Sequence, residues 1–519
     1  MGGPAQSGGQ VGSQRSLSMT VRGVLRRAVD VYRDQPQTAQ RLRHQLDRLD
    51  EPLRVAIAGK VKAGKSTLLN ALVGELIAPT DAGECTRVVT WYCDGHSPKI
   101  VMDPKEGSPA QLPVNRRDGA LIIDMQGAPA ESLNRLVVHW PSPSLRDTTL
   151  IDTPGIASMF TGTSRRTVSF LSPEDDSPTE ADAVIYLMRH LHATDAEFLE
   201  SFRDRRVGRA SSVNTVAVLS RADEIGAGRI DAMFSAKTIA QRYRKDPTLS
   251  GLCQGVVPVA GLLAQTGRTL RQAEFDTLAA LARRPREEVD GLLLSTDRFL
   301  RAASDADTVT QLGESSQTRS RLLARFGLFG LRLSMTLIRQ GTDGPAALAD
   351  ELVRRSGLDE LRELLNTQFT ERRDLLKARS ALLALTAVLH EDTRADTGNL
   401  VAEVERILAG AHEFAELRLL SVLRSGAISL PTPELDEAER LLGGSGGAAA
   451  VRLGQPPSSG TEELRKAALE ALSRWRRRGE NPLSSRAVAD ACRVVVRSCE
   501  GMVARLTGSQ GASDGPGDR

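Results

Sequence analysis

Residues 55–73 read VAIAGKVKAGKSTLLNALV and carry the most specific pattern in the chain. The apolar run at the start predicts a buried strand, residues 59–66 have the GxxxxGKS spacing of a phosphate-binding loop, and residues 67–73 predict a helix. Glycines allow backbone N–H groups to surround a phosphate, and the start of the helix adds the positive end of its dipole. The stretch therefore predicts a nucleotide-binding α/β domain.

Roles within the loop follow from the residue types. In loops of this kind the lysine reaches the β- and γ-phosphates, and the hydroxyl that follows it ligates Mg²⁺. We therefore assign Lys65 to the phosphates and Ser66 to the metal. The residues expected to contact the nucleotide here are Gly59, Lys62, Ala63, Gly64, Lys65, Ser66 and Thr67.

The composition of the 519-residue chain narrows the class of protein. Its 68 Lys and Arg residues nearly balance 65 Asp and Glu residues, so we expect no nucleic-acid partner. Five cysteines show no metal-ligand spacing and favour a reducing compartment. Because the sequence has no run of about 18 apolar residues and no signal peptide, we expect any membrane contact to be peripheral.

Three positions beyond the loop predict elements that sense the γ-phosphate. Thr86 lies in a polar stretch where a GTPase places a threonine that binds Mg²⁺ and the γ-phosphate, and Thr80 and Thr90 are rivals for this role. A later apolar strand ends in Asp152, which would hold Mg²⁺ through a water molecule. Gly155, in the sequence Asp-Thr-Pro-Gly, would donate its N–H to the γ-phosphate.

Ser220, Arg221 and Asp223 belong to a Ser-Arg-Ala-Asp loop after another apolar strand, which matches the guanine-reading pattern Asn/Thr-Lys-x-Asp with two changes. Asp223 would accept two hydrogen bonds from guanine, a geometry that adenine cannot satisfy, and Arg221 would stack on the base. An exposed polar loop is the alternative interpretation of these residues. One strand later, the backbone at Ala260 and Gly261 would donate to guanine O6.

With these motifs in place, the chain resembles the bacterial dynamin-like GTPases. The resemblance covers nearly the whole chain outside its flexible ends. It implies an α/β P-loop GTPase domain with a mostly parallel sheet flanked by helices, and an all-α neck and stalk bundle built from N- and C-terminal segments. It also implies GTP as substrate, Mg²⁺ as cofactor and phosphoryl transfer to water.

The resemblance has cellular implications as well. It implies a cytoplasmic enzyme that is peripherally associated with the inner face of the plasma membrane through anionic lipids, where it remodels or protects the membrane under envelope stress from cell-wall drugs. The implied assemblies are a homodimer through the GTPase domains or a hetero-assembly with a related dynamin-like protein.

The expected domain order places the GTPase domain between helical segments. The ranges are an unstructured N-terminus (1–16), neck helices (17–50), the GTPase domain (51–265), a helical insertion (266–345), a closing helix (346–378), a helical stalk (379–506) with a flexible loop (443–461), and an unstructured tail (507–519).

One departure from the family concerns catalysis. Dynamins have a glutamine that orients the attacking water at the position of Val61, and valine cannot do so. Lys62 would stabilise transition-state charge as an arginine does in some relatives, although a solvated lysine is an equal alternative. The residues to which we assign a catalytic role are Lys65, Thr86, Lys62 and Gly155.

Two other functions compete with a membrane-remodelling GTPase. One is a GTP-binding regulatory subunit that hydrolyses poorly and acts through a related GTPase, which Val61 and the altered guanine motif favour. The other is a ribosome-associated GTPase, which would need a basic RNA-binding face.

Three segments are candidates for the membrane contact. They are the flexible loop 443–461, the apolar patch Phe326–Leu331 and the basic run Arg474–Arg478 around Trp475. The alternative for the apolar patch is a position in the protein core, and the alternative for the basic run is a solvated helix face with Trp475 packed inward.

Overall fold

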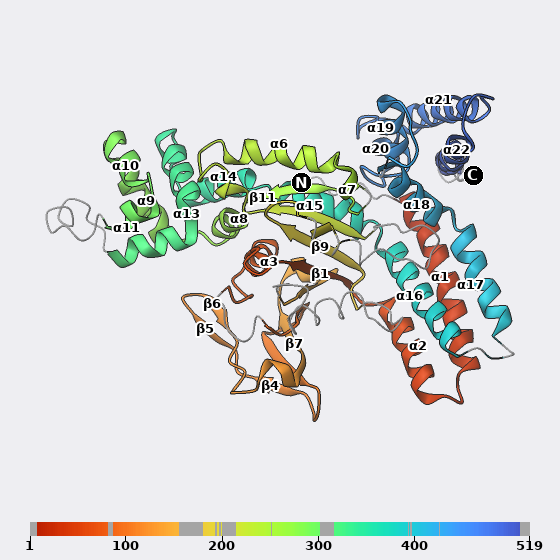
Figure 1. Ribbon diagram of the computed structural model, residues 1–519, viewed down its shortest axis with the longest axis horizontal. Coiled ribbons are helices and arrows are strands. Elements are labelled where there is room, and N and C mark those ends of the chain that lie inside the picture. The colour runs from red at the N-terminus through yellow and green to blue at the C-terminus, as the bar shows by residue number, and fades with distance from the viewer. Residues whose placement is uncertain are drawn as a thin grey trace, which may run out of the picture.

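The computed structural model describes residues 8–80, 87–154, 180–192, 195, 196, 199, 214–250, 252–301, 316–392, 394, 397–424 and 426–508. Within these residues a sheet of nine strands has the order β11-β10-β9-β1-β8-β2-β7-β3-β4 (Figure 1). The strands are β1 Leu53–Gly59, β2 Thr90–Asp94, β3 Lys99–Pro104, β4 Ala110–Leu112, β7 Leu133–Trp140, β8 Thr148–Asp152, β9 Ala183–Met188, β10 Thr215–Ser220 and β11 Val256–Val259. A separate hairpin pairs β5 Asn115–Arg117 with β6 Ala120–Ile122.

The direction of the strands divides the sheet into two parts. The five strands from β11 to β8 run parallel to one another. Beyond them, β2 is antiparallel to β8, β7 is parallel to β2, and β3 is antiparallel to both β7 and β4. Parallel neighbours need crossover connections, which helices supply. The predicted fold class, a mostly parallel sheet flanked by helices, is confirmed.

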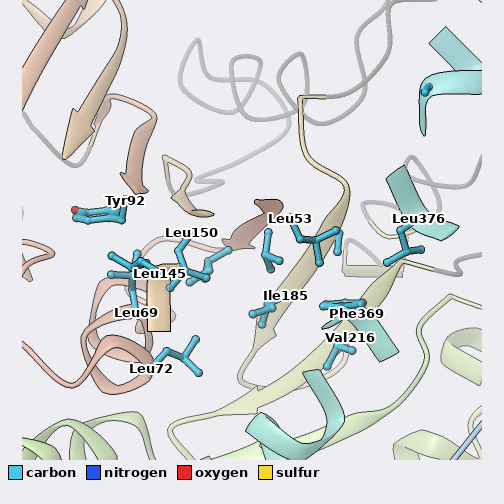
Figure 2. Packing of buried hydrophobic residues seen from close by; sticks show 14 of the residues in the cluster. Leu53, Leu69, Leu72, Tyr92, Leu145, Leu150, Ile185, Val216, Phe369 and Leu376 are labelled. Atoms are coloured by element: carbon cyan, nitrogen blue, oxygen red, sulfur yellow. The ribbon is translucent and has the colours of Figure 1, made fainter. Parts of the chain in front are cut away.

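Both faces of the parallel part are buried, which explains its apolar strands. Every residue of β1, β9 and β10 is buried, as expected for a parallel sheet with helices on both sides. Alternate residues of β1 enter opposite layers of the core. Val55 and Ile57 pack in the cluster that Figure 2 shows, which also contains Phe369 and Leu376. Ala58, in contrast, belongs to the cluster on the other face.

Helices follow the strands and then form the rest of the molecule. Around the sheet lie α3 Lys65–Val73, α6 Ala232–Arg244, α7 Pro247–Ser250, α8 Gly261–Arg268, α9 Gln272–Ala282, α10 Arg286–Leu292, α11 Thr296–Arg301, α13 Ser316–Arg339, α14 Pro345–Arg355 and α15 Leu358–Leu365. At one end of the molecule, α9, α10, α11 and α13 form a group that projects away from the sheet (Figure 1). The helix α13 is kinked at Gly327, whose φ of 63° is not helical.

Four helices form the neck at the other end. They are α1 Gly8–Val31, α2 Pro36–Arg48, α16 Arg373–Glu391 and α17 Gly398–Gly410, which lie side by side (Figure 1). Ion pairs between residues far apart in the sequence hold these helices together. Arg27 meets Glu403 at 2.6 Å, and Arg394 meets Asp34 at 2.9 Å. The N-terminal helices therefore pack with helices that lie beyond the sheet in the sequence, and the residues of these two ion pairs are 376 and 360 positions apart.

The remaining helices form a second bundle with its own apolar core. This bundle consists of α18 His412–Arg424, α19 Thr432–Leu441, α20 Ala449–Leu453, α21 Thr461–Gly479 and α22 Arg486–Gly508. The sequence indicated that the N-terminal helices and the last two helices could share one bundle. The structure instead gives α21 and α22 to this separate cluster, whose buried residues include Trp475 and Cys499.

Charged groups join the neck to the sheet. Arg48 at the end of α2 donates to Asp182 Oδ1 at 2.8 Å, and the other oxygen of Asp182 accepts the backbone N–H of Arg54 at 3.0 Å. Both side chains of the Arg48–Asp182 pair are less than a tenth exposed. From α16, Lys377 donates to the backbone carbonyls of Leu49 and Glu51. The neck is therefore fixed to the starts of β1 and β9.

A second joint connects the C-terminal bundle. Residues 366–370 form a π-helix between α15 and α16, and this segment contacts the glycine-rich stretch after α19. Gln368 donates to the carbonyl of Gly444 at 2.8 Å, and the buried Arg372 donates to the carbonyl of Gly443. On the same side, Arg424 of α18 donates to the carbonyl of Gln254 at 2.9 Å, next to β11.

Three expectations about local structure were wrong in part. Helix α1 begins at Gly8, inside the range 1–16 that we expected to be unstructured. The closing helix expected at 346–378 is instead divided among α14, α15, the π-helix at 366–370 and the start of α16 at Arg373. The segment 443–461 contains α20 and is bound through its glycine carbonyls, so it is not a free loop. A high glycine content gives a segment conformational freedom in the unfolded chain. In the folded protein, hydrogen bonds from Gln368 and Arg372 fix the glycine stretch.

Candidate functional site

The phosphate-binding loop connects β1 to α3 as the sequence predicted. β1 ends at Gly59, where an added Cβ would lie 2.5 Å from the carbonyl oxygen of Leu187, so only glycine fits. Gly64 adopts a φ of 92° immediately before α3 begins at Lys65. Lys62 is also left-handed, with a φ of 61°. Residues other than glycine rarely adopt this left-handed conformation, and those that do cluster at ligand sites.

The metal and phosphate residues meet at the end of β8. Ser66 Oγ donates to Asp152 Oδ2 at 2.8 Å, while Asp152 Oδ1 is buried and has no hydrogen-bond partner among the described residues. Burial raises the pKa of Asp152, against the opposing effects of nearby Lys65 and of the Ser66 hydrogen bond. A hydroxyl and an under-bonded carboxylate are hard oxygen donors of the kind that Mg²⁺ prefers. The arrangement fits a Mg²⁺ ion bound to Ser66, with Asp152 close enough to act through water.

Lys65 is held beside this pair. Its Nζ donates to the carbonyl oxygen of Gly59 at 3.3 Å, which curls the side chain over the loop. Burial lowers the pKa of Lys65, and the carboxylate of Asp152 partly opposes this change. A desolvated ammonium next to the loop is suited to bind phosphate oxygens, because a phosphate would restore the charge interactions that burial removes.

A cavity leads from the phosphate-binding loop to the predicted guanine motif. Its lining includes Ala63, Gly64, Thr67, Ser220, Arg221, Asp223, Glu224 and Gly261. The residues after β1, β10 and β11 meet here because parallel strands place their carboxyl ends at one edge of the sheet. The structure therefore brings together the loop and guanine residues that the sequence assigned separately.

Asp223 has the position and environment expected of a base-reading carboxylate. It is 9% exposed, and burial raises its pKa to about 6. Arg221 adopts a left-handed φ of 52°. Its guanidinium pairs with the carboxylate of Glu224 at 2.5 Å, a contact that the sequence analysis did not identify. The sequence points to Glu224 only through its position next to the Ser-Arg-Ala-Asp motif. Ser220 Oγ donates to the carbonyl of Met188 at 3.2 Å, so its hydroxyl supports the loop.

Ala260, which the sequence assigns to guanine O6, does not face the cavity. Its N–H donates to the carbonyl of Ser356 at 2.9 Å. Gly261, the other residue assigned to guanine O6, lines the cavity.

Two of the residues assigned to sense the γ-phosphate, Thr86 and Gly155, fall outside the described residues. Of the two rivals, Thr90 is buried and donates to the carbonyl of Val88, whereas Thr80 is exposed. Val61 is 52% exposed, and Lys62 is also exposed on the outer side of the loop.

Each of the three candidate membrane segments is partly engaged in contacts within the protein. In Phe326–Leu331, the side chains of Phe326, Phe329 and Leu331 are at most 3% exposed. The segment 443–461 is bound at its glycines, as described above.

The basic run Arg474–Arg478 is largely neutralised by carboxylates. Trp475 is buried and donates through Nε1 to Glu437 at 3.2 Å, so it packs inward as the helical stripe indicated. Ion pairs involve Arg474 with Glu437, Arg476 with Glu500, and Arg478 with Glu434.

Comparisons with known proteins show which family the chain resembles. The dynamin family matches residues 55–220, from β1 to the end of β10. The isoniazid-induced protein IniC of Mycobacterium tuberculosis is 44% identical over 498 residues, which span 95% of this chain and 99% of that protein. The isoniazid-induced protein IniA of the same organism is 31% identical over 33% of this chain and 26% of that protein.

More distant similarities are shorter or weaker. A bacterial dynamin-like protein of Nostoc punctiforme is 32% identical over 20% of this chain and 16% of that protein. Among solved structures, one described as an oligomerised bacterial dynamin pair that senses and tethers membranes covers 95% of this chain and 80% of that chain. Its identity to this chain is 14%, and the TM-score is 0.32.

The raised pKa of Asp223 predicts a pH dependence of guanine recognition. The carboxylate must be ionised to accept two hydrogen bonds from the base, and its pKa is about 6. The affinity for GDP should therefore fall as the pH drops from 7.5 to 5, by up to about tenfold per pH unit below the pKa. Fluorescence titration with a labelled GDP measures this directly.

The matched control is Asp223→Asn, because the phosphates of GDP also titrate near pH 6. The variant should bind more weakly at pH 7.5 and retain only the phosphate component of the profile. Identical pH profiles for both proteins would contradict the assignment of Asp223.

Proposed function

Because this chain belongs to the dynamin family, in the branch represented by IniC, we propose that it binds GTP together with Mg²⁺ and hydrolyses it at the β1–α3 loop. The observation that carries the proposal is the meeting of Ser66 and Asp152 beside the buried Lys65, at one end of a cavity whose other end holds Asp223. One end of this cavity has the groups for phosphates and metal, and the other has the carboxylate for guanine.

The chemistry at such a site is positioning and charge stabilisation. Mg²⁺, when bound, neutralises charge on the phosphates. The loop N–H groups and Lys65 hold the phosphate chain, Ser66 and Asp152 supply oxygens at the metal position, and Thr86 and Gly155 are proposed to hold the γ-phosphate. Asp223 keeps the base in place, so that the γ-phosphate faces the attacking water in one orientation.

The site lacks a side chain that could orient the attacking water at the position of Val61. The Val61 side chain is apolar, so it cannot hold a water molecule by hydrogen bonding, and it is 52% exposed. We propose that Lys62, exposed beside it, supplies positive charge to the transition state when another protein surface covers the loop. That surface is a second copy of the chain or a related dynamin-like protein.

We expect slow hydrolysis that rises with protein concentration. Purified chain with GTP and Mg²⁺ should show a specific activity that increases as the protein is concentrated, because covering the loop excludes water and orients Lys62. Phosphate release is the measurement. Lys65→Ala should abolish both turnover and GTP binding, and Lys99→Ala, which changes an exposed lysine on β3, is the control.

The same experiment separates the two functions that the site permits. GTP binding without turnover at any protein concentration would favour the regulatory-subunit function, for which the exposed Val61 is the specific observation. Equal GTP affinity of wild type and Lys65→Ala would contradict both functions.

We also propose that the protein acts in the cytoplasm as a peripheral membrane protein during envelope stress. The support is the near full-length similarity to a protein named as isoniazid-induced. No helix in the described part of the chain combines the length and hydropathy that a bilayer crossing requires.

The turn between α21 and α22 is the best remaining place for a lipid contact. Leu483 in this turn is 94% exposed, more than any other large apolar side chain in the described residues. Arg477 and Arg486 lie on either side of it in sequence, are exposed, and form no ion pair with the described residues. Each basic residue near an anionic leaflet contributes about 1 kcal/mol, and a buried leucine about 2 kcal/mol.

Flotation with phosphatidylglycerol liposomes tests this contact. Wild type should float at low salt and less at high salt, since the attraction is screened. Leu483→Ser combined with Arg477→Ser should abolish flotation, while Leu469→Ser, a partly exposed leucine on the side of α21, should not. Unchanged flotation of the double variant would exclude the turn as the anchor.

A further inference from the structure

Asp195, which follows β9, is a buried carboxylate that the assigned nucleotide site does not use. The residue is completely buried, and its side chain accepts hydrogen bonds from three donors. Tyr186 donates its hydroxyl to Oδ1 at 2.7 Å, the backbone N–H of His192 donates to Oδ2 at 3.0 Å, and Lys60 donates its Nζ to Oδ2 at 3.0 Å. Burying a carboxylate is unfavourable unless it is paired and hydrogen-bonded, and this one is fully satisfied.

Two of these contacts have a local explanation. The His192 N–H and the Asp195 carboxylate are three residues apart, the spacing of a reciprocal cap at a helix start. Tyr186 belongs to β9 itself, and burial followed by the charge of Asp195 raises the pKa of its hydroxyl, so it stays a donor. Neither the Tyr186 contact nor the His192 contact explains why Lys60 also binds this carboxylate.

The contact with Lys60 crosses 135 positions of the chain and reaches the phosphate-binding loop. Lys60 is the first residue of the loop after Gly59, and its side chain is 40% exposed, whereas that of Asp195 is 1% exposed. A half-exposed lysine therefore turns inward onto a buried carboxylate. The same segment holds the loop again, because Arg189 donates to the carbonyl of Lys62 at 3.4 Å.

The loop is thus fixed on both flanks. β1 lies between β8 and β9 in the sheet. On the β8 side the hold is the hydrogen bond between Ser66 and Asp152, and on the β9 side it is the ion pair between Lys60 and Asp195. The first contains groups that a bound metal would engage, so it changes when nucleotide binds. The second lies away from the cavity lining and remains as an anchor.

We propose that Asp195 is a positioning residue that holds the phosphate-binding loop in its nucleotide-ready shape through Lys60. This inference rests on the proposed binding of GTP and names two residues for it that the sequence did not. Asp195 does not touch the nucleotide. It acts on the phosphate end of the site and not on the guanine end, because Lys60 lies in the loop and no contact links Asp195 to Asp223 within the described residues.

The test compares nucleotides that differ by one phosphate. GDP and GMP are competed against a fluorescent GDP on wild type, Lys60→Met, Asp195→Asn and the double variant. Each single variant should lose GDP affinity by about tenfold, the factor for one charge-assisted hydrogen bond, with GMP affinity unchanged. The double variant should be no weaker than either single variant, because both remove the same contact.

Two further variants separate positioning from folding. Lys60→Arg keeps the charge and should retain wild-type GDP affinity within about twofold, as expected for a rescued ion pair. Lys237→Met removes an exposed lysine of α6 that pairs with Glu360 of α15, far from the loop in the sequence, and should change nothing. Should Asp195→Asn fail to fold, Lys60→Met still decides, because its side chain is half exposed.

Several results would overturn the inference. They are GDP affinity unchanged in Lys60→Met, equal losses for GDP and GMP, or additive losses in the double variant. A wild type that binds no GDP would overturn the proposed function and this inference together, whereas a wild type that binds GDP with unaffected variants overturns the inference alone.

Discussion

The register of β8 against β1 determines where phosphate chemistry can take place in this chain. Ile57 pairs with Asp152, two residues before the loop begins, so the carboxylate arrives beside the first turn of α3 and accepts a hydrogen bond from Ser66. A slip of one residue would send the Asp152 side chain to the other face of the sheet. The large side chains of Val55 and Ile57 on one face of β1 and the small Ala56 and Ala58 on the other oppose such a slip, and the metal position depends on this register.

Strand β9 connects the site to the neck. Asp182 lies immediately before β9 and is paired with Arg48 of α2, while Asp195 lies after it and is paired with Lys60 of the loop. The Arg48–Asp182 pair is buried on both sides, and removing one partner of such a pair costs about 3–5 kcal/mol, so the start of the strand resists displacement. The π-helix at 366–370 offers the C-terminal bundle a second connection.

The sequence predicted what is local and missed what is distant. The loop pattern at 59–66 and the polar ends of apolar strands located the site, because glycine spacing and strand ends are encoded by neighbouring residues. The contact of Lys60 with Asp195 leaves no such pattern, since either residue alone looks like a solvated charge. Composition misled at 443–461, where Arg372 and Gln368 bind the glycine carbonyls, whereas the apolar patch at Phe326 is buried, as its core interpretation expected.

The most direct test of the account is a structure determined with Mg²⁺ and a non-hydrolysable GTP analogue. We expect Mg²⁺ at about 2.1 Å from Ser66 Oγ, with Asp152 in reach through a water molecule. We also expect that Lys65 leaves the carbonyl of Gly59 for the phosphates, and that the guanine edge meets Asp223. An analogue bound with its base away from Asp223, or a metal that does not contact Ser66, would contradict the central claim.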